Sequence, residues 1–263
     1  MSKYFYEEDT WVDDVELAAA TMYTLNGEEY WKKQASYWGE LEPVSPWMEK
    51  GRGPGKEYHH YQWYPFINLG HYLLASSEDK AVSGEFAGYM KQGLQDMRNR
   101  AGNEPFMHGV PYLWCSNNLT SAAVTHAQLY RRATGDETFR EMETSLRDWL
   151  LGCNPWGTTM IPGIPFRMRE GYDFPTETHS SYTSIKGEPT WGGLVDGPIF
   201  NKLFQERAGG VLGDGDPMAV LNNGEAVYHD TIHDYASNEP TMDGTAGLTY
   251  IFAALEQEGR SQR

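Results

Sequence analysis

The feature that most constrains the fold is a joint between helices that occurs twice. In "LNGEEYW" and "ATGDETF", a helical stretch ends at a glycine, an acidic residue follows, and a second helical stretch begins. Gly27 and Gly135 supply the stops, because glycine adopts the left-handed conformation that commonly ends a helix. Recurring helix pairs predict a toroid or solenoid built from α-helical hairpins.

Apolar residues recur at helical spacing on both sides of these joints. The pattern predicts an all-α fold with about seven helices, over residues 10–27, 28–38, 61–76, 85–101, 117–135, 139–150 and 245–257. Residues 258–263 read as a frayed tail.

Between Cys153 and about Pro240 the sequence changes character. Helical periodicity almost disappears, and Gly and Pro become frequent. Loops of this length in a compact domain are usually functional or disordered. Aromatic residues spread through the stretch argue against disorder: Trp156, Phe166, Tyr172, Tyr182, Trp191 and Phe200. We therefore expect long ordered loops over one mouth of the helical body.

The charge of the chain restricts its partners. The 21 Lys and Arg face 37 Asp and Glu, which gives a formal net charge of -16. Nucleic acid and anionic membrane surfaces would be repelled. Aromatic residues make up 14% of the chain, and part of this flat surface suits stacking on sugar rings. The N-terminal residues have no apolar signal core, so the chain as written would stay in the cytoplasm unless its beginning has been removed.

Residues 228–248 gather four carboxylates just before the last predicted helix: Asp230, Asp234, Glu239 and Asp243. Breaking a glycosidic bond requires a carboxylic acid that protonates the leaving oxygen and a second carboxylate that activates water or attacks the sugar. Glu239 fits the role of the acid that protonates the leaving oxygen. The alternative is a first-turn carboxylate stabilised by the helix dipole, which Asp243 fits better than Glu239 does.

This segment closely resembles the C-terminal active-site signature of glycoside hydrolase family 9, the cellulase and endoglucanase family. The matching residues are Tyr228, Asp230, Tyr235, Glu239, Thr241 and Ala246. One position departs from the pattern, because Thr245 stands where the family has Asn. Residues 110–118 and 150–160 also resemble stretches of this family.

The resemblance implies an (α/α)6 toroid and an inverting hydrolase of β-1,4-glucosidic bonds in cellulose or related β-glucans. Glu239 and Asp230 are the catalytic candidates, with Glu239 as the general acid. Asp234 would help to shape the site, and Tyr235 and Asn238 would hold sugar or loop.

Further candidates for substrate binding lie elsewhere in the chain. His179 takes the place of a family histidine that contacts substrate, but Ser181 stands where the family has Arg. Trp114 and Trp191 are candidates for stacking on sugar rings, with a place in the core as the alternative. The resemblance requires no cofactor. Calcium could bind at Asp13 and Asp14, which otherwise read as carboxylates at a helix start.

The largest departure from the family pattern is a missing motif. The family's catalytic base lies in an Asp-Ala-Gly-Asp type motif near the start of the domain, and this sequence contains no such motif. We therefore expect residues 1–263 to form a single, partial catalytic domain, truncated, split, or completed by another chain. The resemblance also implies a secreted or periplasmic protein.

Two other functions stay open at this point. The chain could bind β-glucan without cutting it, which the missing base favours. It could also be a fragment that folds only by self-association over an exposed edge of its toroid.

Overall fold

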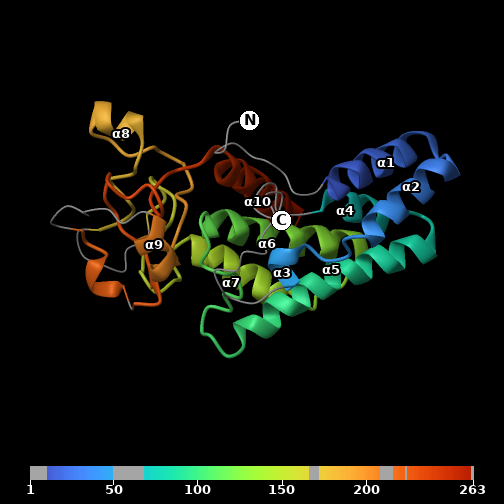
Figure 1. Cartoon of the computed structure of the whole chain (residues 1–263), viewed down its shortest axis with the longest axis horizontal. Coiled ribbons are helices and arrows are strands. Elements are labelled where there is room, and N and C mark those ends of the chain that lie inside the picture. The colour runs from blue at the N-terminus through green and yellow to red at the C-terminus, as the bar shows by residue number, and fades with distance from the viewer. Residues whose placement is uncertain (1–10, 50–67, 166–171, 208–215, 223, 262–263) are drawn as a thin grey trace.

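The structure is a computed structural model and describes residues 11–49, 68–165, 172–207, 216–222 and 224–261. Figure 1 shows a helical body with a loop-rich region at one end, where the short helices α8 (Ser181–Lys186) and α9 (Asn201–Arg207) lie. The first two helices of the chain lie at the opposite end of the body.

All seven predicted ranges contain a helix. The helices are α1 (Val12–Asn26), α2 (Glu29–Glu40), α4 (Leu69–Ala75), α5 (Lys80–Ala101), α6 (Ser116–Thr134), α7 (Arg140–Leu150) and α10 (Met242–Ser261). Residues 61–67 of the third predicted range lie outside the described residues.

Both joints adopt the predicted geometry. Gly27 ends α1 at φ 70°, and Gly135 ends α6 at φ 75°. Each glycine amide donates a hydrogen bond back into its helix, to Tyr23 O and Arg131 O respectively, at 2.8 Å. This left-handed turn closes the helix end and lets the chain reverse into the next helix.

The helices pack as successive hairpins. Within each hairpin α1 packs on α2, α4 on α5, and α6 on α7. The first members also contact one another in the order α1, α4, α6, and α10 then packs on α6. Helices α1, α4, α6 and α10 thus form an inner row, and α2, α5 and α7 pack on it as outer partners. This arrangement is an arc of an all-α toroid. Helix α6 lies in its middle and is buried from Ser116 to Tyr130.

The loop-rich region lies at the end where α6 and α10 begin (Figure 1). It contains α8, α9, a 3-10 turn η2 (Ala219–Leu221) and two short strands, β1 (Ile199–Phe200) and β2 (Ala226–Val227). The strands pair antiparallel with Ile199 opposite Val227. The described part of this region is thus ordered, as predicted, while Phe166 lies outside the described residues.

Two details differ from the sequence prediction. Three short helices escaped it, namely α8, α9 and α3 (Pro46–Glu49), because elements this short contain too little periodicity to detect. The expected frayed tail is wrong as far as Ser261, where α10 ends. Among the helices of the described ranges, none combines the length and apolar character needed to cross a bilayer.

Candidate active site

Glu239 is held at the mouth of the helical body by a short extended segment, residues 195–198. On one side, Asn117 N at the start of α6 donates to Asp196 O at 2.9 Å. On the other side, Asp196 N donates to Glu239 O and Gly197 N donates to Ser237 O, both at 2.9 Å. A Cβ on Gly197 would lie 2.3 Å from the Asn117 side chain, so only glycine permits this close approach.

The side chain of Glu239 has the properties of a general acid. It precedes Met242, the first residue of α10, by three positions, so it is not a first-turn carboxylate. Asp243 is in the first turn, where it accepts a hydrogen bond from Asn118 Nδ2 at 2.8 Å. Partial burial raises the pKa of Glu239 above its usual value, and the nearby His179 opposes that shift only in part. The side chain still reaches solvent.

Three of the predicted rings form a series beside this acid. The His179 and Tyr235 ring centroids lie 5.9 Å apart, and those of Tyr235 and Trp114 lie 5.7 Å apart. His179 Nδ1 lies 2.5 Å from Ile232 O, and because a carbonyl only accepts, Nδ1 carries a proton. His179 N donates to Asn238 O at 3.0 Å, which ties the ring series to the residue before Glu239.

Trp191 belongs to a separate surface. It is 54% exposed and packs edge-on against Phe174, with centroids 5.6 Å apart. It lines an open groove of about 460 Å³ together with Pro240 and the side of α10. Since Pro240 directly follows Glu239, this groove begins beside the acid.

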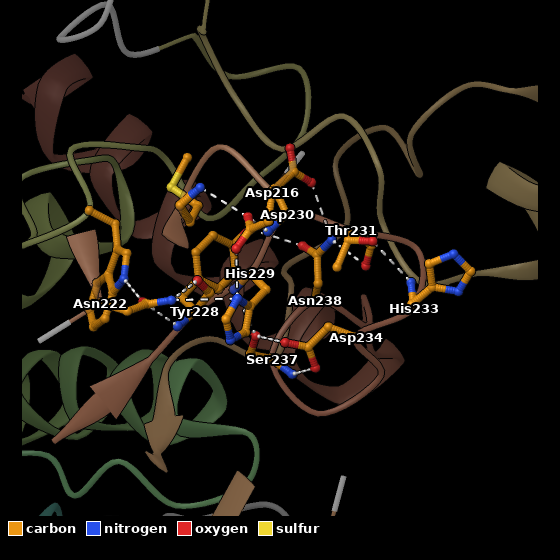
Figure 2. A network of polar contacts seen from close by, with 12 residues as sticks. Asp216, Asn222, Tyr228, His229, Asp230, Thr231, His233, Asp234, Ser237 and Asn238 are labelled. Atoms are coloured by element: carbon orange, nitrogen blue, oxygen red, sulfur yellow. Dashed lines mark hydrogen bonds and ion pairs between the residues drawn. The ribbon is translucent and has the colours of Figure 1, made fainter. Parts of the chain in front are cut away.

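Asp230 is buried in a network of polar contacts that Figure 2 shows. Its carboxylate accepts hydrogen bonds from Tyr172 Oη at 2.9 Å, Thr176 N at 2.9 Å and Glu177 N at 3.0 Å. Asn238 Nδ2 donates to it at 3.2 Å. The carboxylate therefore ties residues 172–177 to the turn that carries Glu239.

Asp234 and Asn238 lie in the same network (Figure 2). Asp234 accepts bonds from Ala236 N at 2.8 Å and from Ser237 Oγ at 2.6 Å, which closes the turn between them. Asn238 Oδ1 accepts from Tyr228 Oη at 2.9 Å, and Asn238 Nδ2 donates to Glu177 O at 2.8 Å. Both side chains are buried and are bonded within the chain.

Two residues that the sequence analysis missed complete this network. Tyr172 reaches Asp230 from a loop far away in the sequence. Asp216 lies 2.7 Å from His229 Nδ1 and accepts a bond from Asp230 N at 3.2 Å. Burial acts to raise the pKa of Asp216, but the bonds from His229 and from backbone amides outweigh burial and hold it below its usual value. The acidic "GDGDP" stretch was the available signal.

Asp196 is the third missed residue. Its side chain is fully buried, and burial raises its pKa well above the usual value. Contact with the Cys115 thiol lowers that pKa in part, and the carboxyl groups of Glu239, Asp243 and Asp234 raise it further. Asp196 is therefore a buried carboxyl group whose neutral form is favoured, and its backbone amide bonds directly to Glu239 O. Neither cysteine forms a disulfide; Cys115 is buried and Cys153 is exposed.

The candidate calcium residues lie at the start of α1, outside the loop-rich region (Figure 1). Burial, with Asp14 and Glu42 nearby, raises the pKa of Asp13 to about 6. Calcium takes six to eight oxygen ligands. Within the ranges the structure describes, no cluster of three or more acidic, His or Cys side chains could hold a metal ion. Calcium binding at Asp13 and Asp14 therefore stays a prediction, and we derive no step of the chemistry through it.

Comparison with known proteins identifies the relatives of this chain. The family model described as Glycosyl hydrolase family 9 matches residues 1–252. No curated protein matches the chain.

Several solved structures are similar to it. AaCel9A in complex with cellobiose-like isofagomine superposes with a TM-score of 0.70 at 18% identity, over 97% of this chain and 45% of that chain. The GH family 9 endoglucanase J30 superposes with a TM-score of 0.65 at 19% identity, over 94% and 42%. The cellulase Cel9M of C. cellulolyticum superposes with a TM-score of 0.61 at 15% identity, over 94% and 50%.

At these identities the structures show a shared fold, and the chain spans half or less of the length of each of these three relatives. The family model covers nearly the whole chain, so this protein belongs to glycosyl hydrolase family 9.

Proposed function

We propose that this chain supplies the general acid of a site that hydrolyses β-1,4-glucosidic bonds in cellulose or related β-glucans. The observation that carries the proposal is Glu239: a solvent-reaching carboxyl group with a raised pKa, next to the ring series of His179, Tyr235 and Trp114. Family membership and the titles of the solved relatives, which are endoglucanases and cellulases, support the substrate class.

Glu239 would act by protonating the glycosidic oxygen as that bond breaks. A raised pKa keeps the carboxyl group protonated closer to neutral pH, so that the proton is available when the leaving oxygen develops charge. In an inverting reaction a second carboxylate activates water on the opposite face of the sugar. We assign Asp230 to positioning rather than to that step, because its oxygens are buried and bonded to residues 172–177 and Asn238.

The rings would place the substrate. Tyr235, which is 37% exposed, and the half-buried Trp114 continue the ring series from His179, and aromatic faces suit the apolar faces of sugar rings. Because His179 Nδ1 is engaged with Ile232 O, His179 Nε2 is the nitrogen that would bond a sugar hydroxyl. Trp191 would stack on a sugar further along the groove that starts at Pro240.

We further propose that additional helices complete the site and supply its base. An apolar groove of about 520 Å³ runs along α4, α6 and α10. Its apolar lining comprises Leu69, Tyr72, Ala122, Leu129, Ala246, Gly247 and Tyr250. Further helices of a complete toroid would cover this groove, and a second copy of the chain is the alternative. Sedimentation at several concentrations separates the two, since a monomer with a cooperative melt excludes self-association.

Replacement of Glu239 by Gln tests the acid. The amide keeps the shape but has no proton to donate, so turnover of cellohexaose by the complete domain should fall by about 10²–10⁴-fold while binding stays nearly intact. Glu177→Gln is the matched control, because Glu177 is an exposed carboxylate in the neighbouring loop, and it should retain turnover.

One outcome would favour the binding function instead. If the parent protein binds cellohexaose without any turnover, and Trp114→Ala abolishes that binding, the chain serves as a β-glucan-binding module. Full turnover by Glu239→Gln would refute the assignment of the acid.

A further inference from the structure

Helix α2 carries the same residue pair twice, as Tyr30–Trp31 and Tyr37–Trp38, seven positions apart. In each pair the tyrosine packs edge-on against the tryptophan that follows it. The centroids lie 4.9 Å apart at 74° in the first pair and 5.2 Å apart at 78° in the second. Both tryptophans are half-buried, whereas Tyr30 is 60% and Tyr37 is 56% exposed.

The two tyrosines share the outward face of this helix. The buried face of α2 is marked by Ala35 and Gly39, and it packs on α1 and α4. At 3.6 residues per turn, Tyr37 lies on the side opposite Ala35, and Tyr30 lies two turns away on nearly the same side. Each ring is held by its tryptophan, so little conformational entropy is lost when a ligand packs on it.

The spacing of the two rings selects the ligand. Seven residues of helix rise about 10.5 Å. An extended β-1,4-linked sugar chain turns over at each unit, so the same apolar ring face recurs at every second sugar, at about this interval. Lys33 and Gln34 lie between the two tyrosines along α2 and can bond sugar hydroxyls. The net charge of -16 disfavours an anionic ligand.

We infer that the Tyr30–Tyr37 face of α2 is a second binding site for a β-1,4-linked glucan chain, separate from the candidate active site. Figure 1 shows α2 at the opposite end of the helical body from α8 and α9, so one molecule could hold a polymer at both places. The choice of a glucan rests on the proposed function, while the geometry of the two tyrosines does not depend on Glu239.

The test measures binding of the full chain to insoluble cellulose and, separately, to soluble cellohexaose. Tyr30→Ala combined with Tyr37→Ala should lower the partition onto insoluble cellulose roughly tenfold, because both stacking surfaces are lost. Alanine favours helix, so α2 should stay folded. The double Phe variant keeps both rings and should bind within about twofold of the parent.

Leu25→Ala is the control for loss of an exposed apolar side chain, since Leu25 is strongly exposed and lies on α1 rather than on α2, and it should bind cellulose like the parent. The inference is overturned if the double Ala variant binds cellulose as well as the parent, or if the parent does not bind cellulose. It is also overturned if the parent sediments as a dimer that the double Ala variant dissociates, because the face then serves a second copy.

If the proposed function is wrong, the measurements differ from those that would overturn the inference about α2. In that case Glu239→Gln retains the turnover of the parent, or cellohexaose binding is insensitive to Trp114→Ala, while the tyrosine-dependent partition onto insoluble cellulose persists.

Discussion

The helical body and the loop-rich region are stabilised in different ways. In the body the buried positions are mainly apolar, as with Leu94 of α5, Leu119 of α6 and Leu146 of α7. In residues 172–240 many buried side chains are polar, and they bond to backbone groups of other loops (Figure 2). Regular helices satisfy their own backbone groups, whereas a loop must find partners for its N–H and C=O groups elsewhere.

This difference explains why the candidate acid lies where it does. Polar side chains that fix the loops also keep part of the bulk water away, and burial raises the pKa values of Glu239, Asp234 and Asp196 alike. Only Glu239 of these three is exposed to solvent. A loop region held by buried carboxyl groups can therefore present to a ligand one carboxyl group with a raised pKa.

The largest effect on stability should come from Asp230. Asp230 is buried. Replacement by Ala leaves the amides of Thr176 and Glu177 and the side chain of Asn238 without this acceptor, so the free energy of unfolding should fall by about 3–5 kcal/mol, measured by urea denaturation. Asp96→Ala is the counterpart in the helical body. Asp96 accepts one exposed bond from Gln92, and its loss should cost no more than about 0.5 kcal/mol. Equal costs for the two variants would mean that the loops do not depend on buried polar contacts.

Replacement of Asp196 should change the free energy of unfolding in the opposite direction to replacement of Asp230. Because burial raises its pKa in the folded state, the folded chain holds that proton more tightly than the unfolded chain does. The stability contributed by this proton is complete below the usual Asp pKa and is lost as pH rises toward the folded pKa. Asp196→Asn removes this dependence.

The Asn variant should therefore be more stable than the parent at pH 7, by about 1–2 kcal/mol, and the difference should shrink toward pH 4. Urea denaturation at several pH values measures it. A difference between the two proteins that does not vary with pH would show that Asp196 is not a neutral acid in the folded state.

The smallest effect on stability should come from replacing the glycines at the two helix joints of the body. Gly27→Ala and Gly135→Ala each place a Cβ in open space, so the cost is only that of holding alanine at positive φ, about 1 kcal/mol. Thermal melts should shift equally for the two variants. A much larger shift for Gly135→Ala would show that the end of the central α6 depends on its tertiary neighbours.

Most of the helical body could be predicted from the sequence, because its signals are local. The stripe of Leu119, Ala122 and Ala123 marks α6, and Gly135 marks its end. Helix α8 had such signals too, since Ser180 caps its start and Gly187 ends it, but six residues are too few to show periodicity.

The candidate site was predictable only in part. Glu239 could be singled out because it follows a run of aromatic and acidic residues that a known family shares. The family pattern predicts roles near substrate for Asp230, Asp234 and Asn238, and the structure places all three inside a network of hydrogen bonds within the chain. Tyr172 lies 58 positions from Asp230, and no local pattern announces that contact.

The sequence alone determined which of the longer segments are helical, where the two main joints reverse the chain, and which family the chain belongs to. Periodicity, capping and composition are properties of neighbouring residues, and neighbours are visible in a sequence. The tertiary structure decided which carboxyl groups are buried, which one faces solvent, and that burial raises the pKa of Asp196 behind Glu239. Burial depends on segments distant in sequence packing together, and the protonation state of a carboxyl group follows from how much water and charge that packing leaves around it.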